Sequence, residues 1–277
     1  MVNLTLHAMR CGTIEQPAAV MLPDAQGHIA VPVMSYLIRH PRGNVVFDAG
    51  LGTSWNASCV RCVSPEAQRL HAYAAGFGMN CFVENNGDLG ARLEAYEMDV
   101  NAIRYMIGSH LHFDHCGGFD RVPNAQLVIQ KREWEYGMRD DTTYHKFEYD
   151  LGHDRLEIEG EHDLFGDGSI VCIPTYGHTP GHQSLRVKLE ERYVILTSDA
   201  CYLRETMEKM ILPGHGAVTA QQDFAENLRL FKRLEDSGAL LLFGDDPGQW
   251  GFLNSDGAAR EITCKDIIRA RAQQVAA

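Results

Sequence analysis

The segment Ser109–His115 constrains this chain more than any other part of its sequence. It places three imidazoles and one carboxylate within six residues, His110-Leu111-His112-Phe113-Asp114-His115. His110 and His112 are two positions apart, so on an extended segment their side chains point the same way. Asp114 and His115 follow at once, so the chain must turn sharply for all four groups to converge. Imidazole and carboxylate ligands suit Zn²⁺, with Fe and Mn as alternatives. The segment therefore predicts a metal site and not a histidine-rich surface loop.

Length and charge narrow the class of protein. The chain has 277 residues, of which 45% are hydrophobic and 22% charged, which is typical of a globular protein with a full core. A net charge of −12 repels a phosphate backbone, so nucleic acid is not an expected partner. No apolar run approaches the roughly 18 residues that span a bilayer, and the N-terminus lacks the features of a signal peptide. We therefore expect a cytoplasmic protein without a membrane partner.

The eight cysteines are scattered along the chain, and an intracellular enzyme of this size needs no disulfide framework. Cys59 and Cys62 have the spacing of half a zinc knuckle. A second such pair is missing, so further ligands would have to come from elsewhere, for example from Cys81. Free thiols in a loop insertion are the favoured interpretation, and a metal or disulfide role for the pair is the alternative.

Hydrophobic periodicity predicts a mixture of strands and helices. A hairpin is expected where two strand patterns flank a turn at residues 40–43. The stretch 51–87 is irregular and rich in aromatic residues, and long excursions of this kind often carry specificity. The expected strands are 31–38, 44–48, 105–109, 125–129, 169–174, 184–189, 193–197 and 239–243, and the expected helices are 89–96, 101–104, 131–136 and 220–234.

Candidate metal ligands follow the ends of these predicted strands. The histidine cluster follows Ile107, Asp199 follows one buried strand, and Asp245 follows another. His178 lies in a Gly/Pro-rich turn between two more strands. A rigid sheet would hold such side chains in place, as a metal centre requires. No linker or composition break is present, so we expect a single domain over residues 1–277 with a substrate-pocket insertion at about 51–87.

The order of these groups resembles the metallo-β-lactamase superfamily, and within it the N-acyl homoserine lactone lactonases, which are quorum-quenching enzymes. The resemblance rests on residues 109–118, on His178-Thr179-Pro180-Gly181-His182-Gln183-Ser184-Leu185, and on Asp199-Ala200-Cys201-Tyr202. It extends from about Val31 to Trp250. It implies an α+β fold, the four-layer αβ/βα sandwich of the superfamily.

The resemblance also implies a dinuclear metal centre that holds two divalent ions, Zn²⁺ first and Fe, Co or Mn as alternatives. One ion is expected on His110, His112 and His178, the other on Asp114, His115 and Asp245, with Asp199 bridging them. A hydroxide held between the ions would attack the lactone carbonyl.

Further roles are expected around this centre. Tyr202 would bind the substrate and donate a hydrogen bond to its carbonyl or oxyanion, while Asp114 would also carry the proton to the leaving oxygen. Phe77 and Phe82 are candidates for the wall of an acyl pocket, and simple aromatic packing is the alternative for both. Asp48 is expected to brace a loop beneath the site.

One position departs from the family pattern. The last ligand of the family is a histidine in a Phe-Gly-His-Asp-Pro-type string, where this chain has Phe243-Gly244-Asp245-Asp246-Pro247. Three outcomes stay open: Asp245 binds the second ion, that ion is held weakly, or another residue replaces the histidine. His215, in a Pro-Gly-His-Gly string, is the obvious replacement, although the order along the chain favours Asp245.

The leading functional hypothesis is hydrolysis of a small-molecule lactone, with N-acyl homoserine lactones as the first candidates. The alternatives are hydrolysis of another lactone or a (thio)ester within the same fold, and a metal-depleted homologue without catalysis. A nuclease is disfavoured because the chain is acidic and lacks a basic patch. The expected assembly is a homodimer.

Overall fold

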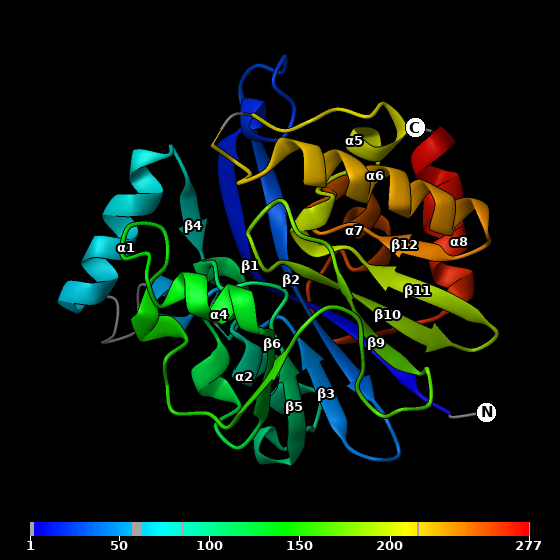
Figure 1. Cartoon of the computed structure of the whole chain (residues 1–277), viewed down its shortest axis with the longest axis horizontal. Helices are drawn as coiled ribbons and strands as arrows, with labels where there is room; N and C mark the ends of the chain where they lie inside the picture. The colour runs from blue at the N-terminus through cyan, green and yellow to red at the C-terminus, as the bar shows by residue number, and fades with distance from the viewer. Residues whose placement is uncertain (1–2, 57–62, 85, 215, 277) are drawn as a thin grey trace.

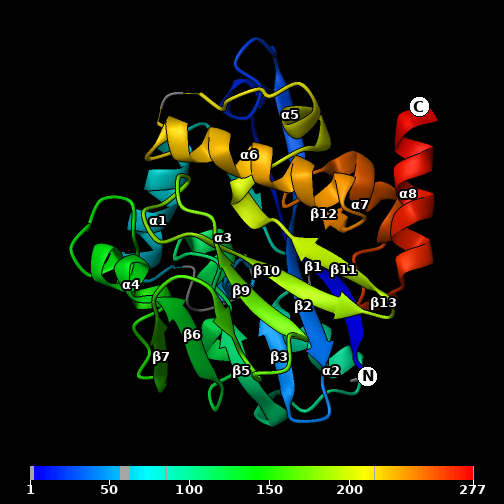
Figure 2. The ribbon, with the colours of Figure 1, turned by 45° about the vertical axis from the view of Figure 1, so that its right-hand side comes forward.

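The computed structural model describes residues 3–56, 63–84, 86–214 and 216–276. Two β-sheets pack face to face, and helices cover their outer faces (Figures 1 and 2). The Cys59/Cys62 pair and His215 lie outside the described residues. None of the described helices has the length and apolar character needed to cross a membrane.

The first sheet has the strand order β13-β1-β2-β3-β5-β6-β7, and β4 pairs with β1. The strands β2 and β3 form the predicted antiparallel hairpin, whereas β3, β5, β6 and β7 run parallel. Its strands are β1 (Thr5–Pro17), β2 (His28–Arg39), β3 (Asn44–Phe47), β4 (Asn80–Phe82), β5 (Ile103–Ile107), β6 (Gln126–Gln130), β7 (Arg155–Ile158) and β13 (Arg260–Ile262).

The second sheet has the order β12-β11-β10-β9-β8. It is antiparallel except for the parallel pair β11 and β12, so these two strands end at the same edge of the sheet. Its strands are β8 (His162–Asp163), β9 (Ile170–Pro174), β10 (Gln183–Leu189), β11 (Arg192–Leu196) and β12 (Leu240–Leu242).

Alternation along the strands builds the layers, because successive side chains point to opposite faces of a sheet. Val194 and Leu196 face the core between the two sheets, where they pack with Phe47 and Ile107 of the first sheet. Ile195, between them in sequence, instead joins the cluster on the outer face of the second sheet. A strand segment that is buried on both faces is therefore continuously apolar, as Val194-Ile195-Leu196 of β11 is.

The outer faces of both sheets are covered by helices, which confirms the expected four layers (Figure 1). Phe224, Leu228 and Phe231 of α6 pack on the outer face of the second sheet. Leu89 and Leu93 of α2 pack on the outer face of the first. The helices are α1 (Pro65–Gly76), α2 (Leu89–Ala95), α3 (Phe113–Cys116), α4 (Lys131–Gly137), α5 (Arg204–Glu208), α6 (Gln221–Asp236), α7 (Pro247–Leu253) and α8 (Cys264–Ala276).

Single turns of 3₁₀-helix join several of these elements. They span Ala18–Val20, Thr53–Trp55, Val100–Ala102, Phe119–Arg121, Lys146–Glu148 and Ser198–Ala200.

Two expectations about local structure were wrong. The stretch 51–87 is not irregular throughout, because it contains α1 and β4. Ser64 caps α1 by accepting a hydrogen bond from the Ala67 backbone nitrogen, and Pro65 occupies the first turn, where proline is tolerated. Residues 101–104 are not a helix either: a 3₁₀ turn gives way to β5 at Ile103, whose side chain is buried in the outer cluster of the first sheet.

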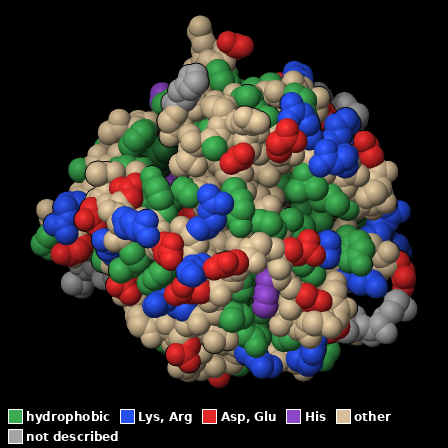
Figure 3. All heavy atoms as spheres, viewed as in Figure 1, with side chains coloured by type: hydrophobic (Ala, Val, Ile, Leu, Met, Phe, Trp, Pro, Cys, Tyr) green, Lys and Arg blue, Asp and Glu red, His purple; other side chains and the backbone are tan. Residues whose placement is uncertain are grey.

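The surface carries charges of both signs. On the face drawn in Figure 3, lysine and arginine side chains lie among aspartates and glutamates.

Candidate metal centre

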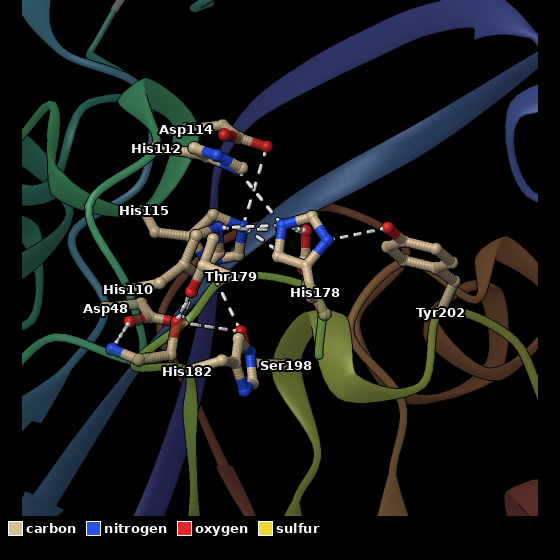
Figure 4. Close-up of polar contacts among 12 residues, drawn as sticks. Asp48, His110, His112, Asp114, His115, His178, Thr179, His182, Ser198 and Tyr202 are labelled. Carbon is tan, nitrogen blue, oxygen red and sulfur yellow. Dashed lines mark hydrogen bonds and ion pairs between the residues drawn. The ribbon is translucent and has the colours of Figure 1, made fainter. Parts of the chain in front are cut away.

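Five of the predicted ligands lie close together where strands of both sheets end, namely His110, His112, Asp114, His115 and His178 (Figure 4). The segment after β5 carries His110 and His112, and the short helix α3 turns the chain so that Asp114 and His115 face back toward them. The loop between β9 and β10 supplies His178. The parallel strands β11 and β12 end beside one another and lead into Asp199 and Asp245, respectively.

Three imidazoles converge on one point. The Nε2 atom of His178 lies 3.1 Å from Nε2 of His110 and 3.0 Å from Nδ1 of His112. Burial lowers the pKa of all three rings, that of His112 to about 4, so they are neutral near pH 7. Neutral ring nitrogens with their lone pairs directed at a common point fit a shared divalent cation.

A second group adjoins the first. The Nε2 atom of His115 lies 3.2 Å from Oδ1 of Asp199 and 3.5 Å from Oδ2 of Asp114. Burial opposes a charge on His115, but Asp199, Asp114 and Asp48 outweigh it and raise the pKa of this ring. Oδ1 of the buried Asp199 accepts no hydrogen bond from the described residues. A buried carboxylate oxygen that faces an imidazole nitrogen without a hydrogen bond to it fits a metal ligand, since both atoms can bind one cation.

Asp199 connects the two groups. Its Oδ2 atom lies 3.3 Å from Nε2 of His178 and 4.0 Å from Nε2 of His110, while its Oδ1 faces His115. Among the described residues, the sets whose ligand atoms all lie within 4.8 Å of one another are His110 with His112 and His178, and His110 with His115 and Asp199. The donor chemistry of both sets suits divalent metal ions.

Asp245 and Asp114 line the same cavity as Asp199, but neither of the two belongs to a convergent set. The backbone nitrogen of Asp245 donates to the carbonyl oxygen of Tyr202 over 3.1 Å. Burial raises the pKa of the Asp245 carboxyl well above its usual range, and the nearby Asp199 raises it further. Three carboxylates that share one cavity repel one another, and a bound cation would relieve that repulsion.

Asp48 orients His115 from beneath. Its Oδ2 atom accepts a hydrogen bond from Nδ1 of His115 over 2.9 Å, and its Oδ1 accepts one from the Ser109 backbone nitrogen over 2.7 Å. This contact leaves Nε2 of His115 directed at the centre. Asp48 and the neighbouring Ser198 both have positive φ, 55° and 48°. Strained backbone of this kind gathers at functional sites.

Tyr202 contacts the predicted ligand His178 on the side of the imidazole ring that faces away from the centre. Its hydroxyl lies 2.9 Å from Nδ1 of His178 and 3.2 Å from the carbonyl oxygen of Ala217, and Tyr202 is 4% exposed. One arrangement satisfies all these groups. Nδ1–H of His178 donates to the Tyr202 oxygen, whose hydroxyl donates to Ala217, so Nε2 of His178 keeps its lone pair for a cation.

A cavity of about 430 Å³ opens over the centre. Phe77, directly after α1, lines this cavity and is 51% exposed. Phe82 is not among the described residues that line the cavity. Phe82 lies on β4, where Cys81 points inward and Phe82 points to solvent, because side chains alternate along a strand. The apolar part of the wall includes Ile14, Pro17, Met21, Val31, Tyr73, Phe77, Met79, Phe113 and Val218.

Two residues beside the centre were missed by the sequence-based prediction. Glu133 of α4 is fully buried, and its carboxylate accepts hydrogen bonds from both histidine-bearing loops. Tyr144 lines the cavity and donates a hydrogen bond to Glu133 over 3.0 Å. Nothing in the sequence distinguishes Glu133 from Glu135, which is exposed on the same helix.

Comparison with known families agrees with this geometry. Residues 28–244 match the family model of the metallo-beta-lactamase superfamily. The chain belongs to the metallo-beta-lactamase superfamily.

Individual relatives indicate which members of the superfamily the chain is similar to. The chain is 31% identical to the N-acyl homoserine lactonase AttM of Azorhizobium caulinodans over 263 residues, which cover 90% of this chain and 96% of the relative. It is 29% identical to AttM of Agrobacterium fabrum over 90% of this chain and 96% of that one. A solved N-acyl homoserine lactone hydrolase with the product N-hexanoyl-L-homoserine at its catalytic metal centre has the same fold. Its TM-score is 0.76 at 23% identity, over 89% of this chain and 94% of that one.

Proposed function

We propose that this protein is a metal-dependent hydrolase that opens the ring of a lactone, with N-acyl homoserine lactones as the leading substrates. The observation that carries the proposal is the convergence of His110, His112 and His178 with Asp199 and His115 at the floor of an apolar cavity. The curated relatives named N-acyl homoserine lactonase support the same substrate class.

The proposed centre holds two divalent ions, Zn²⁺ first, as in the solved dizinc quorum-quenching lactonase AidC, which has a TM-score of 0.66 to this chain. When bound, such ions act as Lewis acids that polarise a lactone carbonyl and make water nucleophilic near neutral pH. His110, His112 and His178 would hold one ion, and Asp114, His115 and Asp245 the other, with Asp199 shared.

Asp114 is suited to move the proton. Burial alone would raise the pKa of its carboxyl, but the neighbouring His115 outweighs burial and lowers it, so Asp114 is ionised near pH 7. Hydrolysis adds water to the lactone carbonyl carbon and breaks the ring C–O bond, which releases a carboxylate and a hydroxyl group. Asp114 would accept the proton of the attacking water and pass it to the leaving ring oxygen.

Tyr202 and the cavity wall would bind the substrate. Tyr202 lines the cavity and its hydroxyl contacts His178, so a lactone bound over the centre would lie near Tyr202. The apolar wall that includes Tyr73 and Phe77 suits an acyl chain, because apolar surface removed from water contributes about 25 cal/mol per Å².

A lactone panel tests the proposal. Purified protein loaded with Zn²⁺, Co²⁺ or Mn²⁺ is mixed with N-acyl homoserine lactones of several chain lengths, and ring opening is followed by proton release. We expect turnover that a chelator abolishes and added metal restores. Loaded protein that leaves every acyl homoserine lactone intact would overturn the substrate assignment. Fewer than about one tightly bound ion per chain would instead support a non-catalytic homologue.

A further inference from the structure

A single buried carboxylate joins the two loops that carry the three convergent histidines. Glu133 lies in the first turn of α4 and is fully buried. Its Oε1 atom accepts a hydrogen bond from the Leu111 backbone nitrogen, between His110 and His112, over 3.1 Å. Its Oε2 atom accepts hydrogen bonds from the Thr179 hydroxyl over 2.8 Å and the Gly181 backbone nitrogen over 2.9 Å, directly after His178.

The same carboxylate also reaches the cavity wall. Tyr144 donates its hydroxyl to Oε1 of Glu133 over 3.0 Å, and its ring lies 5.3 Å from that of His112. Tyr144 lines the cavity. One carboxylate therefore accepts four hydrogen bonds from three segments of the chain, and no lysine or arginine among the described residues forms an ion pair with it. Such a carboxylate stays buried only because these donors replace its water.

The backbone around Glu133 is closely fitted to the loop that follows His178. A Cβ atom built on Gly181 would lie 2.3 Å from the backbone nitrogen of Glu133 and 2.6 Å from its Cα. Only glycine allows this approach, so the loop and α4 are held together by both packing and hydrogen bonds. The position of His178 relative to His110 and His112 consequently depends on α4.

We propose that Glu133 is a positioning residue that fixes the spacing of the His110/His112 loop against the His178 loop and thereby sets how tightly the centre retains a divalent ion. This inference rests on the proposed metal-dependent function. Glu133 contacts no reacting atom. It acts through the backbone of the ligand loops, in the way that groups behind the ligands tune a metal site.

The isosteric variant Glu133→Gln tests the role of both oxygens. A glutamine has one acceptor oxygen, and its amide group must face either the Leu111 nitrogen or the Gly181 nitrogen, neither of which can accept a hydrogen bond. Either orientation releases one loop. We expect Zn²⁺ to leave the loaded protein about 10- to 100-fold faster when a colorimetric chelator is added in excess, as for other groups behind metal ligands.

Tyr149→Phe is the matched control. The Tyr149 hydroxyl donates to the carbonyl oxygen of Gly137, at the end of the same helix, over 2.8 Å, and Tyr149 is buried. Its loss should lower the melting temperature without changing zinc release. Equal release rates in wild type, Glu133→Gln and Tyr149→Phe, each loaded with Zn²⁺, would overturn the proposal.

Milder variants keep the test decisive if Glu133→Gln does not fold. Thr179→Val removes one donor from the His178 loop and should also speed zinc release, whereas Tyr144→Phe should raise KM more than it changes release. A Thr179→Val protein that retains zinc like wild type would contradict the inference. Zinc release is measured without substrate. A protein that fails the lactone assay can therefore still confirm or contradict the role of Glu133.

Discussion

At the residue scale, Asp245 stands where the family has histidine, and its replacement tests whether this position binds the second ion. Asp245→His replaces a carboxylate that adjoins Asp114 and Asp199 by a neutral imidazole, a ligand better suited to Zn²⁺. We expect up to about one additional Zn²⁺ per chain after loading and dialysis, measured by elemental analysis. Asp245→Asn serves as the control, since it removes the charge without adding an imidazole. Unchanged occupancy in Asp245→His would indicate that Asp245 does not occupy a ligand position.

Tyr202 gives a second residue-scale prediction. Tyr202→Phe removes the hydroxyl that bridges Nδ1 of His178 and the carbonyl oxygen of Ala217. Because this contact orients a proposed ligand and Tyr202 also lines the cavity, we expect kcat/KM to fall by about 10- to 100-fold. Steady-state lactonase assays measure the effect, with Tyr193→Phe on the exposed side of β11 as the control. An effect confined to KM would support substrate contact alone, and unchanged kinetics would exclude both roles.

The predictability of the site also differs from residue to residue. The cluster from His110 to His115 could be predicted because four ligand-type side chains in six residues have no simpler explanation. Glu133 could not, because its role depends on the loops after β5 and β9 meeting beside α4. The order of residues along the chain does not tell whether the Asp245 side chain reaches the convergent ligands or whether Phe82 lines the cavity. Both depend on the local geometry of the folded chain.

At the element scale, α1 forms one side of the cavity, and Phe77 at its C-terminal end allows a prediction about chain length. Phe77→Ala should raise KM for N-decanoyl homoserine lactone several-fold and change that for short acyl chains less, because only a long chain reaches the rim. Each buried methylene contributes about 0.8 kcal/mol. Phe82→Ala is the matched control, since Phe82 lies outside the cavity wall. Equal effects of both variants at all chain lengths would contradict this assignment.

Elements were predictable where periodicity was strong. The strands β6, β10 and β11 are buried apolar or alternating segments, and they form within a residue of where the pattern predicts them. The helix α1 was missed because it is rich in alanine and buries only a narrow stripe of small side chains with Leu70. The strands β4 and β13 have three residues each and are stabilised by pairing with β1. Such pairing is a tertiary contact, and no local sequence pattern predicts it.

At the scale of the whole molecule, the two ends of the chain share one core. Leu4 and Leu6 of the N-terminal segment pack in the same cluster as Ile267 and Ala270 of α8 and as the inner faces of both sheets. The described segments near both ends therefore pack into the core between the two sheets, and the division of the chain into domains stays a prediction. The four-layer architecture followed from the resemblance, whereas the pairing of β1 with β13 had no signal in the sequence.

His7 links this shared sheet to the acid stability of the whole protein. It lies on β1 opposite Glu261 of β13, is 1% exposed, and its ring lies 4.8 Å from that of Tyr96. Burial, assisted by the charge of Arg39, lowers the pKa of His7 from 6.5 to about 4. The unfolded chain therefore binds the proton more readily, so this residue's contribution to stability is lost as the pH falls from 6.5 toward 4 and is constant above that window.

His7→Gln, which cannot titrate, isolates that contribution. We expect the urea midpoint of the metal-free wild type to decline more steeply than that of the variant between about pH 6.5 and about pH 4.5. All other titrating groups are common to both proteins, so the difference between the two slopes belongs to position 7. Denaturation curves monitored by tryptophan fluorescence measure both midpoints. Parallel pH profiles would show that His7 titrates alike in the folded and unfolded chains, and that its burial between β13 and β2 does not oppose protonation.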